Sequence, residues 1–211
     1  MQKLKWALAV AALIAATSGM AWAATALDVN ATCAQGGSNF GLQVMHDGTN
    51  TNAFLIDDSP SSETRIIVQV YGKLDTANGY TMNNGDTHLV WRGRQTGLPG
   101  AVNRMQVRRR PDGTYTMAAW HLLDAGSEFI GEVFFNPGVF QCFIFDWQAS
   151  SSPGAGDGTA SIQKCSGAPK TVSNRNNNYV IDSQNLGSFA GIDAGTTGPI
   201  CWDNFSSRRA P

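Results

Sequence analysis

The sequence predicts an all-β fold in which two antiparallel sheets pack as a sandwich of the jelly-roll type. Short runs with β-strand character recur along the chain, clusters of Gly, Asn, Asp, Ser and Pro separate them, and no window of helical periodicity competes. The expected strands are Phe40–Met45, Ile66–Leu74, His88–Arg92, Val102–Arg109, Thr114–Trp120, Gly131–Phe135, Gln141–Trp147, Ser161–Cys165, Tyr179–Asp182 and Ile200–Phe205.

The first 23 residues have the pattern of a secretory signal peptide. Lys3 and Lys5 provide positive charge, residues 6–16 are mostly apolar, and Ala21-Trp22-Ala23 has the small-x-small pattern that precedes cleavage. A retained membrane anchor is the alternative, but this apolar run is shorter than the about 18 residues that span a bilayer. We therefore expect cleavage after Ala23, a single jelly-roll domain over residues 24–211, a secreted or periplasmic location and no further membrane span.

The mature chain is long enough for one sizeable core and carries a mild negative charge. Removing 23 of 211 residues leaves 188, which is within the usual size of one domain. Two lysines leave with the leader, so 13 Lys and Arg remain against 16 Asp and Glu, a net charge of −3. This balance disfavours nucleic acid as a partner.

Four cysteines follow the leader, and an even number in an exported chain predicts two disulfides. A metal site is the alternative, but the sequence has no C-x-x-C and no His at ligand spacing from a Cys. Three pairings are open at this point. The four residues are Cys33, Cys142, Cys165 and Cys201.

A hairpin around the Ser/Gly/Pro-rich segment Ser150–Gly158 indicates which of the three cysteine pairings forms. The simplest antiparallel register pairs Phe145 with Ile162, and in the same register Cys142 lies opposite Cys165. Directly opposed residues have Cα atoms about 5 Å apart, which a disulfide can bridge. We therefore expect a Cys142–Cys165 disulfide. The same register also pairs Trp147 with Ala160.

The remaining cysteines, Cys33 near the mature N-terminus and Cys201 near the C-terminus, would then form the second disulfide. Such a bond closes a loop of more than a hundred residues, which stabilises the fold by roughly 4 kcal/mol in the chain-entropy model.

A second hairpin is expected at the turn tripeptide Pro111-Asp112-Gly113. Folding the chain about it sets Val107 opposite Tyr115 and Met105 opposite Met117 on one face. Because alternate residues of a strand share a face, the other face is polar. It carries Arg104, Gln106, Arg108, Thr114 and Thr116.

Several segments, taken in their order along the chain, carry a resemblance to a known family. They are Asn39–Val44, Asp57–Arg65 leading into Ile66–Tyr71, Phe140–Ser151 followed by a Gly-rich loop, Ala160–Lys164, Ile181–Gly187 and Gly198–Arg209. In these segments the chain is similar to the laminin-G-like or concanavalin A-like lectin-glucanase jelly-roll domains, in particular to small secreted bacterial members of unknown function. The resemblance implies two antiparallel sheets, one of them concave, with the first and last strands side by side. That adjacency agrees with a Cys33–Cys201 disulfide.

The resemblance also implies a candidate cofactor. Many domains of this fold hold a structural calcium with an Asp of the closing strand, and Asp203 has that position. Calcium takes six to eight oxygen ligands, so backbone carbonyls would have to complete the shell. The alternative is that Asp203 accepts hydrogen bonds from neighbouring backbone or from Arg208.

The catalytic patterns of this fold are missing from the sequence. Its glycoside hydrolases carry Glu-x-Asp-x-x-Glu on one strand, whereas here Glu128 and Glu132 are four apart on a turn that enters a strand and need not point together. Polysaccharide lyases of related folds use a Tyr or His beside Arg, Gln and Asn, but their motifs are absent. The histidines His46, His88 and His121 are expected at the surface or at strand edges. We therefore expect no catalytic centre.

A binding role needs fewer specialised residues. Sugar rings pack on Trp and Tyr, and their hydroxyls suit amides and guanidinium groups. The candidate ligand-binding residues on the concave sheet are Trp91, Arg92, Arg104, Gln106, Arg108 and Trp120, whereas Trp147 and Trp202 are assigned to the core. For Trp91 and Trp120 core packing is an equal alternative, and for the arginines the alternative is a solvated sheet face.

The first hypothesis is thus a secreted, non-enzymatic domain that binds a polysaccharide, a cell-surface glycan or another surface polymer. A jelly-roll polysaccharide lyase or glycoside hydrolase and a structural or adhesive envelope protein without a small ligand are the alternatives.

Overall fold

The computed structural model describes residues 26–49 and 52–209. In these ranges the chain forms two short 3-10 helices, η1 (Ala31–Cys33) and η2 (Thr76–Asn78), and thirteen strands. The strands are β1 (Ala26–Asn30), β2 (Gly41–Asp47), β3 (Ala53–Asp57), β4 (Arg65–Leu74), β5 (Thr87–Arg94), β6 (Asn103–Arg109), β7 (Tyr115–Leu123), β8 (Gly126–Phe134), β9 (Gln141–Gln148), β10 (Gly158–Lys164), β11 (Lys170–Arg175), β12 (Ser183–Phe189) and β13 (Thr197–Arg209).

The expected signal peptide, residues 1–23, and its cleavage after Ala23 lie outside the described residues. Among the residues that are described, no helix has the length and apolar character that crossing a membrane requires.

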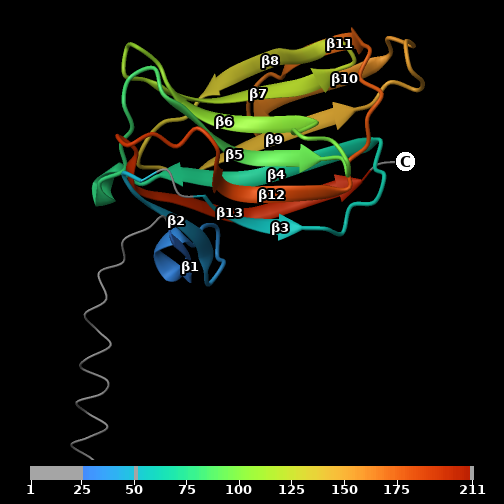
Figure 1. Cartoon of the computed structure of the whole chain (residues 1–211). Helices are drawn as coiled ribbons and strands as arrows, with labels where there is room; N and C mark the ends of the chain where they lie inside the picture. Colours follow the sequence, from blue (N-terminus) through green and yellow to red (C-terminus); the bar gives the residue numbers. More distant parts are fainter. Residues whose placement is uncertain (1–25, 50–51, 210–211) are drawn as a thin grey trace, which may run out of the picture.

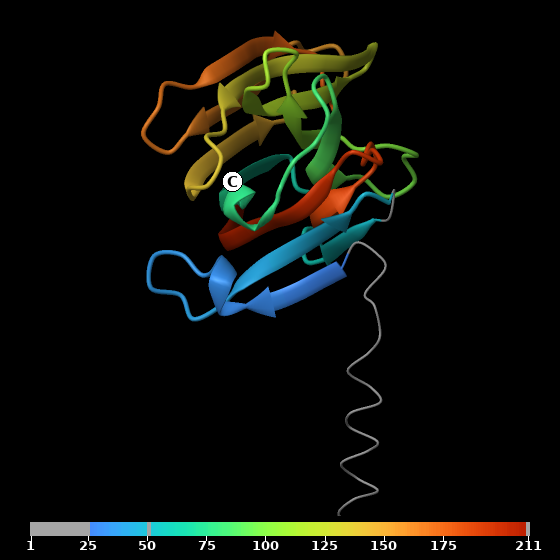
Figure 2. The ribbon, with the colours of Figure 1, turned by 90° about the vertical axis from the view of Figure 1, so that its left-hand side faces the viewer.

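The strands form two antiparallel sheets that pack face to face (Figures 1 and 2). One sheet has seven strands in the order β1-β2-β13-β4-β9-β10-β11, and the other has six in the order β3-β12-β5-β6-β7-β8. In Figure 1 the six-stranded sheet runs from β8 at the top to β3 at the bottom. The predicted fold class, an all-β two-sheet sandwich, is confirmed.

The core lies between the sheets and follows from strand alternation. Along β4 buried and partly exposed residues alternate without a break, so Ile66, Val68 and Val70 all point inward. Burying each such side chain contributes about 1.5–3 kcal/mol relative to leaving it in water. Trp147 and Trp202, which the sequence assigned to the core, are fully buried there.

The hairpin of β9 and β10 has the predicted register. Phe145 pairs with Ile162, Trp147 pairs with Ala160, and the Cys165 amide donates to the Cys142 carbonyl at 3.0 Å. The Cys142–Cys165 disulfide is confirmed, with Cα atoms 5.4 Å apart.

The second predicted disulfide, Cys33–Cys201, is also present, with Cα atoms 5.0 Å apart. It bonds η1 to the closing strand β13, which pairs with β2 so that Ile200 lies opposite Val44. The first and last strands expected from the sequence, Phe40–Met45 and Ile200–Phe205, are therefore neighbours, with β1 outside them. Two disulfides fit a secreted or extracellular protein.

The predicted register of the β6–β7 hairpin is wrong by two residues. Val107 pairs with Met117, and Tyr115 pairs with Arg109. The loop is centred on Asp112, whose carboxylate accepts hydrogen bonds from the backbone amide and the hydroxyl of Thr114. An even shift keeps every side chain on its predicted face, so the assignment of the two faces holds.

Four strands were not expected, namely β1, β3, β11 and β12. The predicted strand Tyr179–Asp182 lies in a connection, where Ile181 forms an isolated bridge to Glu63, and β12 follows it. β12 is an interior strand of its sheet and is almost fully buried, although its sequence is polar. Its residues Gln184, Asn185 and Ser188 can be buried because each forms a side-chain hydrogen bond. Period-2 hydrophobicity therefore does not reveal this strand.

Candidate functional site

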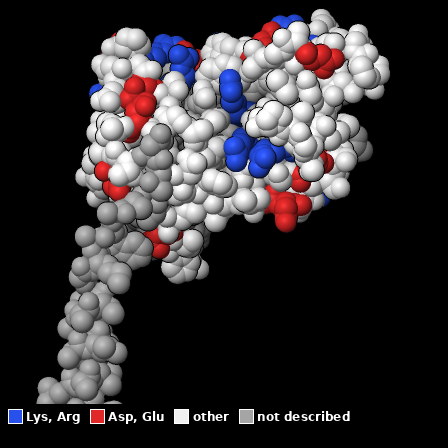
Figure 3. Space-filling view, in the orientation of Figure 1, with Lys and Arg blue, Asp and Glu red and all other residues white. Residues whose placement is uncertain are grey.

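Five of the six predicted binding residues lie together on the outer face of the six-stranded sheet. We call these five the arginine face: Arg92 of β5, Arg104, Gln106 and Arg108 of β6, and Trp120 of β7. The alternating residues Met105 and Val107 are buried in the core, so the arginine-face residues of β6 point outward. Figure 3 views this side and shows Lys and Arg gathered near its middle, over β5 and β6, with acidic residues towards the margins.

The expectation that Trp91 belongs to a binding surface is wrong. Trp91 is fully buried, its Nε1 donates to Gln184 Oε1 at 3.3 Å, and its ring lies 5.2 Å from that of Phe145. Successive side chains of a strand point to opposite faces, so Trp91 and Arg92 cannot both reach the outer face.

Trp120 is the centre of the arginine face. It pairs with Arg104 across the β6–β7 ladder, and the Arg104 guanidinium carbon lies 5.4 Å from the indole centroid. The corresponding distance from Arg108 is 5.8 Å, and the ring of Phe129 on β8 lies 5.1 Å away. Two cations therefore hold a partly buried indole. Burial lowers the pKa of Arg104.

Arg92 occupies the β5 side of the face and is fixed by three neighbours. Its Nε donates to Asn185 Oδ1 at 2.8 Å, and its guanidinium carbon lies 4.6 Å from the Phe189 centroid and 5.7 Å from the Phe54 centroid. Burial, followed by the charge of Arg94, lowers the pKa of Arg92. The guanidinium group is thus held in place.

Glu132 on β8 is a member of the site that the sequence did not reveal. It accepts from Arg108 at 3.3 Å, from the Thr116 hydroxyl at 3.0 Å and from Arg110. Arg110 continues the every-second-residue series of arginines, so strand alternation could have indicated it. The position of Glu132 depends on the pairing of β8 with β7, which carries no local sequence signal.

Glu128 and Glu132 do not act as a pair, because a register shift between β7 and β8 separates them. Glu132 faces outward, whereas Glu128 accepts from His121 at 2.9 Å and from Arg175 at 2.6 Å. The Arg175 hydrogen bond is the main reason for the lowered pKa of Glu128. The two carboxylates therefore lie on opposite faces of β8 and do not point together.

The expectation of surface or strand-edge histidines is wrong for all three. The side chains of His46, His88 and His121 are buried, and burial is the main cause that lowers the pKa of each. His46 Nδ1 donates to the Gly198 carbonyl at 3.0 Å, and its Nε2 accepts from the Ser188 hydroxyl at 2.8 Å. These rings are parts of the packed interior.

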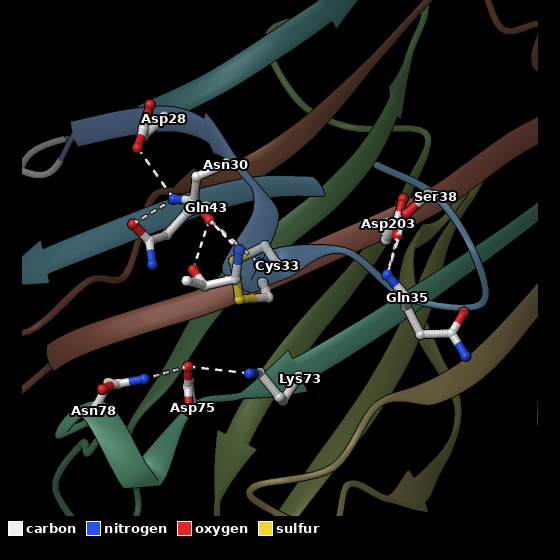
Figure 4. The surroundings of a disulfide bond; sticks show 12 residues. Asp28, Asn30, Cys33, Gln35, Ser38, Gln43, Lys73, Asp75, Asn78 and Asp203 are labelled. Atoms are coloured by element: carbon white, nitrogen blue, oxygen red, sulfur yellow. Dashed lines mark hydrogen bonds and ion pairs between the residues drawn. A yellow bond between two sulfur atoms is a disulfide. The ribbon is translucent and has the colours of Figure 1, made fainter. Parts of the chain in front are cut away.

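Asp203, the candidate calcium ligand, fastens the loop that follows Cys33 (Figure 4). Its carboxylate accepts from the backbone amide of Gln35 at 2.6 Å, the hydroxyl of Ser38 at 2.5 Å and the backbone amide of Asn204 at 2.7 Å. Among the described residues no group of three or more His, Cys, Asp or Glu could hold a metal ion. This geometry accounts for Asp203 without a metal, and calcium there stays a prediction.

An apolar hollow of about 350 Å³ lies at the margin of the sandwich formed by the edge strands β1 and β3. β1, β2 and β13 line it on one side, and β3 and β12 line it on the other. Its walls include the exposed side chains of Phe40, Leu55 and Ile56, and its charged members are Asp57 and Asp203. Among the described residues that line this hollow there is no Lys or Arg, so it differs in chemistry from the arginine face.

Comparisons with known proteins identify the fold. The chain matches no protein-family model and no curated protein sequence. Among solved structures, "Cellulose induced protein, Cip1" aligns with a TM-score of 0.60 and 13% identity over 88% of this chain and 86% of that chain. The alginate lyase PA1167 from Pseudomonas aeruginosa aligns with a TM-score of 0.51 and 8% identity over 81% of this chain and 83% of that chain.

The receptor-binding domain of botulinum neurotoxin type G aligns with a TM-score of 0.53 and 8% identity, over 89% of this chain but 44% of that chain. At such low identities these likenesses concern the fold alone. With the observed order of strands, they identify the chain as a jelly-roll β-sandwich, consistent with a concanavalin A-like fold.

Proposed function

We propose that this protein is a secreted, non-enzymatic β-sandwich domain, of the laminin-G-like type, that binds a carbohydrate through the arginine face. The observation that carries the proposal is Trp120, an outward-facing indole whose centroid lies 5.4 Å and 5.8 Å from the guanidinium carbons of Arg104 and Arg108, respectively. An indole offers an apolar surface for a sugar ring, and the flanking guanidinium groups offer donors for hydroxyl or carboxylate oxygens.

The charges of the face favour an acidic glycan. Arg92, Arg104 and Arg108 form its cationic part, and Glu132, the carboxylate beside them, is already engaged by two arginines. Gln106 faces Ala118 across the ladder, and the small Ala118 side chain adds no bulk next to the amide. A polymer that carries carboxylates or sulfates would meet both a stacking surface and unbalanced positive charge.

A glycan array followed by calorimetric titration of the best ligand tests this proposal. Trp120→Ala and Arg104→Ala should each weaken binding by about tenfold or more, since 1.4 kcal/mol corresponds to a factor of ten. Tyr71→Ala and Arg65→Ala are matched controls, because both residues lie on β4 in the other sheet. Glycan binding that both arginine-face variants retain would contradict the proposal.

The same samples separate the alternatives. Incubation with acidic polysaccharides, followed by absorbance of new unsaturated ends and by release of reducing sugar, reports a lyase or a hydrolase. Turnover in either assay would contradict the non-enzymatic part of the proposal. An array without any bound glycan would favour a structural or adhesive envelope protein instead.

A further inference from the structure

A cationic hollow of about 430 Å³ lies beside the arginine face, where the edge strand β8 meets the β10–β11 hairpin of the other sheet. Arg110, Thr116 and Glu132 line it from the six-stranded sheet, and Lys164 and Lys170 line it from the hairpin. Its apolar lining residues are Val133, Phe134 and Ala168. We call it the lysine hollow.

The two lysines occupy strand positions that elsewhere face the core. Lys170 pairs directly with Ile162 on β10, and Lys164 is two residues further along β10. Both therefore lie on the same side of the sheet as Ile162, which is fully buried. At this end of the sandwich, two cations replace the apolar side chains that normally close the interior.

The backbone fixes the positions of both lysines. A Cβ at Gly131 of β8, where φ is +158°, would lie 2.6 Å from the Cβ of Lys170, so glycine permits the close approach of the two elements. The turn that joins the two lysines begins at Cys165, which is bonded to Cys142, and the Gly167 amide donates to the Lys164 carbonyl at 2.9 Å.

The hollow carries positive charge that its own acid does not balance. Glu132 is the carboxylate among the lining residues, and it is occupied by Arg108, Arg110 and Thr116. Neither Lys164 nor Lys170 forms an ion pair with a residue that the structure describes. Unpaired ammonium groups above an apolar wall suit a carboxylate or sulfate on a sugar ring.

The hollow is continuous with the arginine face. Arg108 contacts Trp120 on one side and Glu132 on the other, and Glu132 contacts Arg110 of the hollow. Along β7, Trp120 and Thr116 are four residues apart, a distance of about 13 Å. A ligand that contacts both Trp120 and the lysines must therefore be an oligomer.

From this geometry we propose that the lysine hollow is a second, anion-binding subsite, and that the ligand is an acidic polysaccharide whose chain extends from Trp120 into the hollow. The inference rests on the proposed function of the arginine face. Its specific content is that Lys164 and Lys170 bind a carboxylate or sulfate several sugar units away from the ring at Trp120.

The test uses the full mature protein and oligogalacturonates of increasing length, with cello-oligosaccharides as neutral probes. Lys164→Gln with Lys170→Gln should leave affinity for the shortest oligogalacturonate unchanged and weaken binding of long ones by about tenfold or more, because two charge-assisted contacts are lost. The affinity of this variant should also depend less steeply on salt. The matched control is Arg65→Gln with Arg208→Gln, which removes two charges from β4 and β13 of the same seven-stranded sheet, at residues that do not line the lysine hollow.

The outcomes distinguish the two proposals. If Trp120→Ala abolishes binding while the lysine variant binds long oligomers as the control does, the hollow is not a subsite and the arginine face remains. If Trp120→Ala has no effect on any oligomer, the proposed function itself fails. An equal loss at every oligomer length would also overturn the second subsite, since it would indicate a long-range effect of charge. Melting temperatures show whether each variant is folded.

Discussion

Arg104 and Trp120 face each other across the β6–β7 ladder, with the guanidinium carbon 5.4 Å from the indole centroid. Strand alternation fixes this pair, because every second residue of β6 and β7 points away from a core of Met105, Val107 and Met117. Packing of the two sheets thus determines which side chains a ligand can meet. The contact itself contributes about 0.5–2 kcal/mol.

Replacement of Trp91 should mainly reduce stability, whereas replacement of Trp120 should mainly reduce glycan binding. Trp91→Ala removes a fully buried side chain and should lower the free energy of unfolding by about 3–5 kcal/mol. Trp120→Ala removes a partly exposed side chain and should cost about 1–2 kcal/mol while weakening glycan binding. Urea unfolding and titration of the same samples measure both effects. Equal destabilisation by the two substitutions would contradict the assignment of Trp120 to the outer face.

The protein should lose stability as the pH falls below about 6.5, the pKa of histidine in an unfolded chain. Burial lowers the folded-state pKa of His46, His88 and His121, so the unfolded chain binds protons that the folded chain does not. Stability is therefore full above the unfolded pKa and declines as the pH falls toward the folded pKa values. Each proton that only the unfolded chain binds lowers the free energy of unfolding by about 1.4 kcal/mol per pH unit.

His88→Leu tests this origin, because both ring nitrogens of His88 lack a hydrogen-bond partner among the described residues and its ring lies 5.3 Å from that of His46. The variant should show a shallower decline of stability between pH 6.5 and 5 in chemical unfolding. A decline as steep as in the wild type would assign the effect to other groups.

The sequence predicted most reliably what local pattern and covalent spacing determine. The β9–β10 register follows from one loop and two cysteines, and β4 follows from unbroken alternation. The arginine series of β6 is visible for the same reason. By contrast, the buried strand β12 is stabilised by Gln184, Asn185 and Ser188, whose partners come from other strands.

Features formed between strands distant in sequence were not predictable. Glu132 reaches Arg108 only after β8 pairs with β7 and a register shift turns Glu128 to the other side. Likewise, Lys164 and Lys170 have ordinary strand-end sequences, and their hollow exists only where the two sheets meet. Such sites depend on tertiary packing, to which single-sequence periodicity is insensitive.

Asp203→Ala should lower the free energy of unfolding by about 1–3 kcal/mol, because it removes the carboxylate that accepts from the Gln35 amide and the Ser38 hydroxyl and leaves the Gln35 amide only the Ser38 Oγ at 3.1 Å as acceptor. The loss should be the same in calcium and in EDTA if hydrogen bonding is the role of this carboxylate. Thermal unfolding under both conditions measures it. If calcium raises the melting temperature of the wild type and Asp203→Ala abolishes that increase, the result would instead support the calcium site that the resemblance implies.

The two disulfides should differ in their effects on stability and on binding. Cys33–Cys201 has a sequence separation of 168 residues and Cys142–Cys165 one of 23. Loop-closure entropy therefore predicts a loss of roughly 4–5 kcal/mol when the Cys33–Cys201 pair is replaced by serine and of about 3 kcal/mol for the Cys142–Cys165 pair. Only the Cys142–Cys165 pair anchors the turn between Lys164 and Lys170, so its replacement should selectively weaken binding of long oligogalacturonates. Chemical unfolding and titration of both double variants, under conditions where each is folded, measure the two effects. A loss of long-oligomer affinity that is equal in both variants would show that the turn does not position the lysines.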